Sequence, residues 1–88
     1  MAYKIAFTQR FKKHFKKFSE TEKKQIKRKL GLLGEDPFHP SLRTKKINKG
    51  NDVFEFSVNM DIRITWFYES DSIIIALDIG HHDILDRL

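Results

Sequence analysis

The sequence predicts one α+β domain over residues 1–88, with two helices packed on one face of a small, mostly antiparallel four-stranded sheet. Apolar residues recur at helical spacing in the N-terminal half, and apolar and polar residues alternate at strand spacing in the C-terminal half. A chain of 88 residues has room for a single hydrophobic core. The expected order is therefore strand, helix, helix, strand, strand, strand, which is typical of an α+β sandwich.

The first elements are a short strand and an amphipathic helix. Residues 1–7 alternate weakly, and Thr8 is placed to end this strand and to cap a helix of two to three turns. The apolar side chains of this helix share one face because they are spaced four and three residues apart: Phe11, Phe15 and Phe18.

A second, longer helix is predicted after Ser19. Ser19 and Glu22 have the spacing of a capping box, and apolar residues follow at positions 26, 30 and 33. This helix should end near Gly34, because glycine favours the left-handed terminating conformation and Pro37 cannot continue a helix. Residues 36–41, with two prolines, then predict an ordered loop.

Further strands are predicted from residue 53 onwards, where the period changes to two. Residues 53–58 and 62–67 predict a hairpin, and residues 73–79 predict a last strand that is apolar on both faces and therefore covered. Residues 42–50 are basic and show no clear pattern, and the type of the short C-terminal segment stays open.

The alternation assigns the strand residues to two faces. The face toward the helices receives Phe54, Phe56, Ile62, Ile64, Trp66, Ile73, Ile75, Leu77 and Ile79. The opposite, partly open face receives Glu55, Ser57, Arg63, Thr65, Asp78 and, if the last strand continues, His82. The second set gathers polar groups of separate strands into one patch, whereas Trp66 is expected in the core rather than on a base-stacking surface.

The composition excludes several classes of protein. No cysteine is present, which excludes disulfides and thiolate metal sites. The longest apolar run, residues 73–77, is far shorter than the roughly 20 residues that span a bilayer, and the N-terminus lacks the apolar segment of a signal peptide. We therefore expect a soluble cytoplasmic protein with no membrane partner.

The charge is distributed unevenly along the chain. Residues 1–50 hold 15 Lys and Arg against 4 Asp and Glu, whereas residues 51–88 hold 2 against 8. A basic half of this strength favours a polyanion such as nucleic acid, and it would attract an acidic protein chain equally well. A lysine-rich helical face that is merely solvated is the alternative.

Four features then occur in one order along the chain. They are the basic two-helix half, the Leu-x-x-Lys-Lys-Ile stretch at residues 42–47, the Asp-Ile-Arg-Ile of residues 61–64, and the Gly-His-His-Asp-Ile-Leu of residues 80–85. In this order and spacing the chain resembles the RelE/ParE superfamily of toxins over essentially its whole length. The resemblance implies a small bacterial toxin that a cognate antitoxin neutralises. The RelE-like branch cuts messenger RNA on the ribosome without a metal or other cofactor, and the ParE-like branch inhibits DNA gyrase.

The resemblance also implies roles for individual residues. Arg63 matches an arginine that contacts the scissile phosphate, and His82 matches a basic position that acts as an acid or a phosphate ligand. The remaining expected catalytic residues are the neighbours His81 and Asp83. The expected RNA-binding residues are Lys45 and Lys46, near a segment whose lysines grip RNA, and Lys13, Lys16 and Lys17 of the basic helical half.

Cleavage of RNA through its own 2′-hydroxyl needs a base, a cation for the developing charge and an acid for the leaving oxygen. Arg63 suits the second task, and a histidine that titrates near neutrality suits the third. A carboxylate would orient that histidine, and the candidates are Asp61, Asp78 and Asp83.

Other interpretations of these residues stay open. Arg63 can be a sheet residue paired with Glu55 or Asp78, and the two histidines can be a surface pair without a role. A metal site at His81, His82, Asp83 and Asp86 is disfavoured, because neighbouring strand residues point to opposite faces.

The chain also departs from the cleaving branch in two places. Ser57 stands where that branch usually has a second basic residue, and residues 85–88 lack its aromatic side chain. The competing hypothesis is therefore a non-enzymatic binder, either a gyrase inhibitor or a relative that binds only an antitoxin. In every case we expect the antitoxin to bind through an acidic helix or strand.

Overall fold

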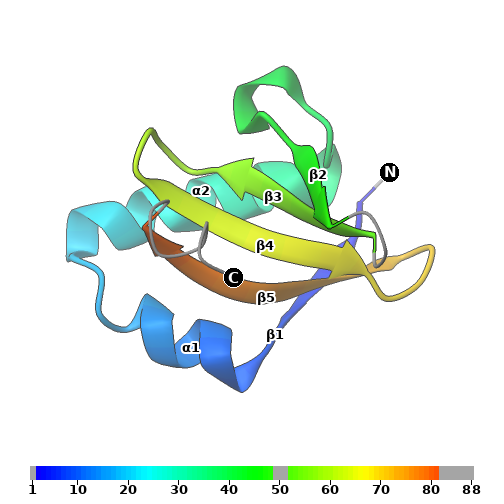
Figure 1. Ribbon diagram of the computed structural model, residues 1–88. Coiled ribbons are helices and arrows are strands. Elements are labelled where there is room, and N and C mark those ends of the chain that lie inside the picture. Colours follow the sequence, from blue (N-terminus) through cyan, green and yellow to red (C-terminus); the bar gives the residue numbers. More distant parts are fainter. Residues whose placement is uncertain (1, 49–51, 82–88) are drawn as a thin grey trace.

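The computed structural model describes residues 2–48 and 52–81. In chain order the described elements are β1 (Lys4–Phe7), α1 (Gln9–Phe15), α2 (Glu20–Glu35), a 3₁₀ turn η1 (Pro40–Leu42), β2 (Lys45–Asn48), β3 (Val53–Ser57), β4 (Ile62–Tyr68) and β5 (Ile73–His81). The strands form one sheet in the order β1-β5-β4-β3-β2, with β1 parallel to β5 and the other pairs antiparallel (Figure 1). The α+β fold class is confirmed. The sheet among these residues has five strands, however, and the predicted number of four is wrong.

The strand missed from the sequence is β2. It pairs with β3 at the edge of the sheet, where Lys45 lies opposite Glu55 and Lys46 opposite Phe54. Lysines on an edge strand discourage pairing with other chains, and they also interrupt the apolar alternation by which a strand is found. The register of β2 and β3 then shifts between Lys46 and Asn48.

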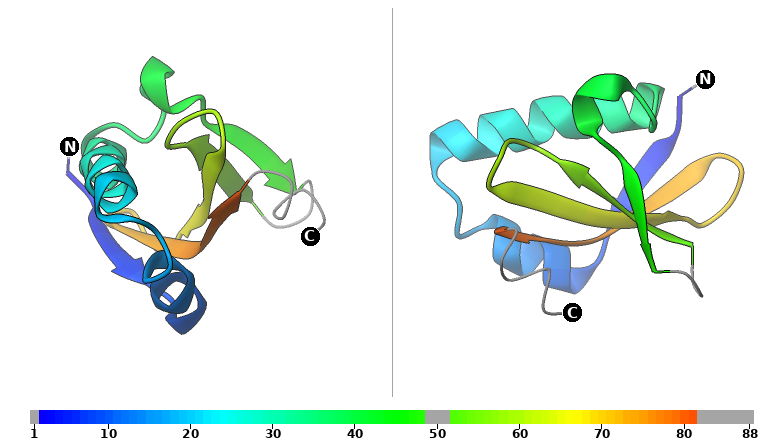
Figure 2. Two further views of the ribbon diagram at one scale, coloured as in Figure 1. Left: turned by 90° about the vertical axis from the view of Figure 1, so that its left-hand side faces the viewer. Right: turned by 45° about the horizontal axis from the view of Figure 1, so that its top comes forward.

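The hydrophobic core lies between α2 and the sheet. Figure 2 shows α2 crossing one face of the curved sheet, and its buried residues are Ile26, Leu30, Leu33 and Gly34. The opposing core side chains include Phe56, Ile62, Ile64 and Trp66. Trp66 is completely buried and stacks on Phe54 with ring centroids 4.8 Å apart. The prediction that this tryptophan belongs to the core is confirmed.

The C-terminal end of α2 is close to the predicted position, but the reason given for it is wrong. The helix continues through Gly34 to Glu35, and no described glycine has a positive φ. Gly34 is needed for a close approach instead, because a Cβ there would lie 3.2 Å from the carbonyl oxygen of Tyr3. The backbone N–H of Tyr3 donates to the carbonyl of Gly34 at 2.7 Å, which ties the chain before β1 to α2.

The side chains of β5 that point into the core are partly different from those predicted. Its register with β4 shifts between Thr65 and Trp66, which leaves Leu77 without a partner on β4. Such a bulge reverses which side chains face the core. Beyond it Ile79 is buried as predicted, but before it the buried residues are Ile74 and Ala76. The predicted core residues on this side are only half-buried: Ile73, Ile75 and Leu77.

The prediction that both helices pack on one face of the sheet is wrong. β1 pairs with β5 only as far as Ala76, and α1 follows along β5 beyond that point (Figure 2). Phe11 enters the core, whereas His14 contacts Asp78, whose register places it on the opposite face. Helix α1 therefore straddles the edge of β5. It ends at Phe15, so Phe18 lies in the turn before α2 rather than on the helix.

Both predicted helix caps are present. Thr8 accepts a hydrogen bond from the backbone N–H of Phe11, and Ser19 and Glu22 form the reciprocal capping box. None of the described helices is long and apolar enough to cross a membrane.

We expect Ser19→Ala to lower the free energy of unfolding by about 1 kcal/mol at pH 7, the usual contribution of an N-cap. The hydrogen bonds from the backbone and side chain of Ser19 hold the pKa of Glu22 below its ordinary value. A carboxyl group whose pKa is lower in the folded than in the unfolded protein stabilises the fold at pH values above its unfolded-state pKa. This stabilisation is lost as the pH falls through the folded-state pKa. The difference between the wild type and Ser19→Ala should therefore shrink at pH 3. Urea unfolding at both pH values measures it, and equal stability of the two proteins at pH 7 would contradict the cap.

Candidate functional site

A row of polar residues crosses four strands on the face opposite α2. Lys45 lies opposite Glu55, Glu55 opposite Thr65, and Thr65 opposite Asp78. We call these four residues the polar row. The sequence placed three of them on one face, which the register confirms, but it expected that face to be partly open. Instead Glu55 is 4%, Thr65 5% and Asp78 6% exposed.

Glu55 forms the centre of the row. Its Oε1 lies 3.6 Å from Lys45 Nζ and 3.9 Å from Arg63 Nε. Arg63 also donates from Nη1 to the backbone oxygen of Asn59 at 2.7 Å. A buried carboxylate requires such cations, because burial removes its hydration. The pairing of Arg63 with Glu55, left open by the sequence, is therefore present, and it places an acid and a cation side by side.

A cavity of about 270 Å³ lies beside Arg63. Its lining includes Ser57, the cross-strand partner of Arg63, and Arg43, which follows the 3₁₀ turn η1. Arg43 adopts a left-handed conformation with φ of 53°, a region that costs energy for residues with a Cβ. The sequence analysis found no second basic residue near Ser57, and the loop supplies one. No pattern in residues 41–44 indicated this role for Arg43.

The second buried carboxylate, Asp78, is held by α1. Its Oδ1 lies 2.6 Å from His14 Nδ1 and accepts from the backbone N–H of Ile79 at 2.8 Å. Its Oδ2 lies 3.8 Å from Arg10 Nε. The sequence analysis did not select His14 or Arg10. The available signal was their spacing of four residues, which puts both on one side of a helix.

The described histidine at the end of β5 also has a carboxylate partner. His81 Nδ1 lies 2.6 Å from Asp61 Oδ2, and Asp61 is one of the three carboxylates that the sequence offered to orient a catalytic histidine. Asp78 orients His14 instead. The predicted roles of His82 and Asp83 concern residues that lie outside the described part of the chain.

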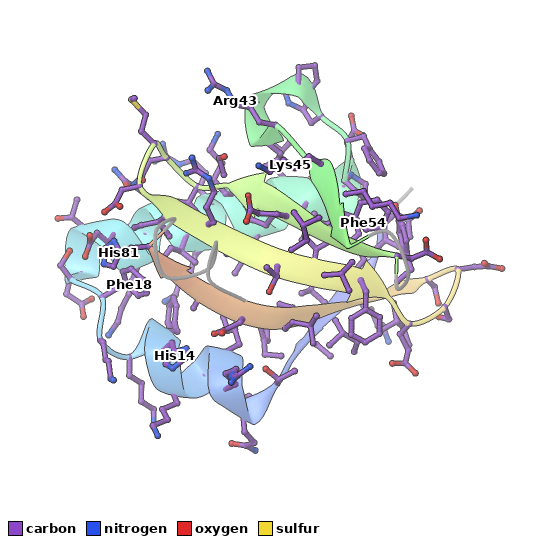
Figure 3. The ribbon with its side chains drawn as sticks, in the orientation of Figure 1. His14, Phe18, Arg43, Lys45, Phe54 and His81 are labelled. Atoms are coloured by element: carbon purple, nitrogen blue, oxygen red, sulfur yellow. The ribbon has the colours of Figure 1, made fainter. Side chains whose placement is uncertain are left out.

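His14 and His81 line one further cavity, also of about 270 Å³, where the turn between α1 and α2 meets the end of β5. Figure 3 shows the two histidines with Phe18 between them. The polar lining also includes Lys17, Glu22 and Asp78. We call this the histidine cavity. Its wall includes Gly80, which is the cross-strand partner of Arg63.

The predicted RNA-binding lysines lie in different parts of the structure. Lys45 belongs to the polar row, and Lys17 lines the histidine cavity. Lys46 points to the opposite face of β2 and pairs with Asp52 at 2.8 Å. The other two are exposed along and just after α1: Lys13 and Lys16. Among residues 2–48 and 52–81, no three His, Asp or Glu side chains are arranged to hold a metal ion.

Comparison with known proteins identifies the class of fold. No protein-family model and no curated protein sequence matches the chain. Solved structures do match it, including a chain of the archaeal RelE–RelB complex from Pyrococcus horikoshii, with a TM-score of 0.77, 15% identity, and coverage of 92% of this chain and 96% of that one. A mutant of the free Escherichia coli toxin RelE has a TM-score of 0.76 at 20% identity, covering 98% and 90%. Escherichia coli YafQ has a TM-score of 0.76 at 16% identity, covering 94% and 97%.

The chain therefore has the fold of the RelE/ParE superfamily of toxins, as the sequence resemblance implied. At these identities the likeness establishes the fold, and the activity has to be argued from the residues that this chain presents.

Proposed function

We propose that this chain is the toxin of a toxin–antitoxin pair and that it cleaves messenger RNA on the ribosome. One observation carries the proposal. Two arginines from separate elements, Arg43 and Arg63, line the same cavity, and the buried carboxylate of Glu55 lies 3.9 Å from Arg63. This arrangement combines phosphate-binding cations with a potential base, which a surface that only binds a partner does not require.

The proposed reaction is attack by the 2′-oxygen of the RNA on the adjacent phosphorus. Glu55 takes the 2′-hydroxyl proton, and the arginines stabilise the charge that develops on the phosphate oxygens. The bond from phosphorus to the 5′-oxygen breaks, and a histidine gives that oxygen its proton. The products are a 2′,3′-cyclic phosphate and a 5′-hydroxyl.

The proton donor belongs to the histidine pair His81 and His82. His81 is held by Asp61, and a carboxylate on one ring nitrogen fixes the orientation of an imidazole. The resemblance to the cleaving branch matches His82 to a basic position that acts as an acid or a phosphate ligand. Comparing His81→Gln and His82→Gln in the cleavage assay described next would identify the donor.

Expression of the chain without a partner should stop amino-acid incorporation, because cleavage removes the translated message. Primer extension on ribosome-bound mRNA should show cuts that are absent from a control carrying Arg63→Ala. If incorporation continues while DNA supercoiling collapses, the ParE-like alternative is correct and the nuclease proposal is wrong.

The proposed partner is an antitoxin with an acidic binding segment. The solved structures that match the fold include toxin–antitoxin complexes from Escherichia coli and Mycobacterium tuberculosis. The N-terminal half of this chain, with its excess of Lys and Arg, suits an acidic chain laid across it. A pull-down with the product of the adjacent reading frame, repeated at high salt, tests the partner and its charge dependence.

RNA binding should weaken steeply as salt rises, and α1 should contribute to that slope. Changing Lys13, Lys16 and Lys17 together to Glu should reduce the slope of log affinity against log salt by about two, because each phosphate contact with a single strand contributes roughly 0.7. Filter binding of single-stranded RNA between low and physiological salt measures it.

A matched variant separates the position of these charges from their number. Changing Lys24, Arg28 and Lys29 of α2 to Glu alters the net charge equally but leaves the region of α1 intact. We expect a smaller reduction in slope for this variant. Equal reductions in the two variants would show that Lys13, Lys16 and Lys17 act only through net charge.

A further inference from the structure

The histidine cavity has the features of a site for one planar ring. One wall is formed by Phe18 and His81, whose ring centroids lie 5.7 Å apart at an angle of 42°. Gly80 adds backbone without a side chain, so this wall is not obstructed. The volume of about 270 Å³ lies just below the roughly 300 to 1,000 Å³ of pockets for drug-sized ligands, which suits a single ring system.

The polar groups around the ring wall are of two kinds. Asp78 and Glu22 offer carboxylate oxygens, and each ionised carboxylate has about four acceptor sites. Oδ1 of Asp78 is engaged by His14 and Ile79, its Oδ2 lies 3.8 Å from Arg10 Nε, and Oε1 of Glu22 accepts from the backbone N–H of Ser19. Lys17 supplies a cation on the same cavity. These groups suit the three parts of a nucleotide: the carboxylates can accept from the base edge, the rings can stack on the base, and the cation can bind the phosphate.

We propose that the histidine cavity binds one unpaired nucleobase of the RNA, with the phosphate of that nucleotide on Lys17. Unstacked bases of single-stranded RNA are commonly recognised by stacking on aromatic side chains together with hydrogen bonds to the base edge. This inference rests on the proposed function, since it assigns a base-specific subsite to the same RNA.

The position of the cavity makes it a specificity site. Gly80 in its wall lies directly opposite Arg63, and side-by-side residues on adjacent strands are about 5 Å apart. One residue of the cavity wall therefore lies beside the strand that carries the proposed phosphate site, while the ring wall at His81, the cross-strand partner of the buried Ile62, stands on the other face of the sheet. A base held in the cavity would lie within a few nucleotides of the cut in the RNA.

The acceptors indicate which bases should bind best. Guanine presents a ring N–H and an adjacent amino group to a carboxylate, whereas uracil presents one ring N–H between two carbonyl oxygens. Carboxylates only accept hydrogen bonds when ionised, so Asp78 and Glu22 should repel those carbonyls. We expect guanosine 5′-monophosphate to bind at least about fivefold more tightly than uridine 5′-monophosphate, the equivalent of roughly 1 kcal/mol.

Direct titration of the purified full chain tests the site without any cleavage assay. The imidazole C–H signals of His14 and His81 should shift on addition of guanosine 5′-monophosphate, while those of His39, which lies against Ser41 in the loop, stay fixed. Ribose 5-phosphate should bind at least about tenfold more weakly, because it lacks the stacking worth roughly 1 to 3 kcal/mol per base.

Two substitutions and matched controls identify the contacts. Phe18→Leu keeps an apolar side chain without the ring, and Lys17→Ala removes an exposed cation; each should weaken guanosine 5′-monophosphate binding about tenfold, by loss of stacking or of a charged contact. Phe38→Leu and Lys24→Ala, both at exposed positions away from the cavity, should not change it. No shift at either histidine, ribose 5-phosphate as tight as the nucleotide, or Phe18→Leu equal to the wild type would each overturn the base site.

Failure of this site and failure of the proposed function give different results. A chain that binds the nucleotide at His14 and His81 but cuts no RNA would overturn the nuclease and keep the base site. A chain that cuts RNA, shows no histidine shift and keeps its cleavage preference in Phe18→Leu would keep the nuclease and overturn the base site.

Discussion

Arg63→Ala should reduce RNA cleavage by about 100-fold to 1,000-fold, the usual loss when one group that stabilises transition-state charge is removed. The guanidinium is held by Glu55 and by the backbone oxygen of Asn59, so it is already positioned for a phosphate in the adjacent cavity. Arg63→Lys should recover only part of the rate, because lysine keeps the charge but loses the two-pronged geometry. Single-turnover cleavage of mRNA on purified ribosomes measures these rates.

Arg63→Ala should also lower the stability of the protein, but it should not unfold it. Without Arg63, Glu55 keeps only Lys45 as its cation among the described contacts, and one hydrogen bond to Asn59 is lost. We expect a loss of roughly 1 to 2 kcal/mol in unfolding free energy, too little to unfold a domain. Arg28→Ala, on the exposed surface of α2, is the matched control and should change neither quantity. Wild-type cleavage by a folded Arg63→Ala protein would remove Arg63 from the site.

The part of the site that could be predicted from the sequence consists of residues on two strands joined by a hairpin. Alternation alone placed Glu55, Arg63 and Thr65 on one face, because a strand repeats every two residues and a hairpin fixes the register of its two strands. The helix caps at Thr8 and Ser19 were equally local, and both are present. Local patterns therefore accounted for most elements and for the centre of the polar row.

Contacts between distant segments could not be predicted in this way. His14 and Asp78 lie 64 residues apart, and they meet only because β1 is shorter than β5 and leaves an edge for α1. Arg43 follows a 3₁₀ turn, and its own left-handed backbone conformation brings it to the cavity of Arg63. An arginine in the sequence does not indicate a left-handed conformation in the way that a glycine or an asparagine does. Each depends on tertiary packing, and both add groups to the candidate site that the sequence analysis lacked.

The bulge in β5 shows how one residue changes an otherwise sound prediction. A strict period of two along residues 73–79 puts Ile73, Ile75 and Leu77 in the core, and a single unpaired residue exchanges them for Ile74 and Ala76. Because the last strand is apolar on both faces, its sequence could not distinguish the two arrangements. With Ile74 and Ala76 buried, an unbulged strand would carry Asp78 to the core face as well, so the bulge at Leu77 keeps that carboxylate on the opposite face.

Ile74→Asp should therefore unfold the domain, whereas Ile75→Asp should not. Ile74 is completely buried, so an aspartate there loses roughly 2 to 3 kcal/mol of apolar burial and places an uncompensated charge in the core at a further cost of several kcal/mol. Such a sum is comparable with the whole stability of a small domain, about 5 to 15 kcal/mol. Ile75 is its half-buried neighbour on the other face, and the identical substitution there leaves the carboxylate access to water. Far-ultraviolet circular dichroism and thermal melts of the two variants measure the difference. Unfolding of Ile75→Asp with a native melt for Ile74→Asp would restore the unbulged strand and overturn the assignment of Ile74 and Ala76 to the core.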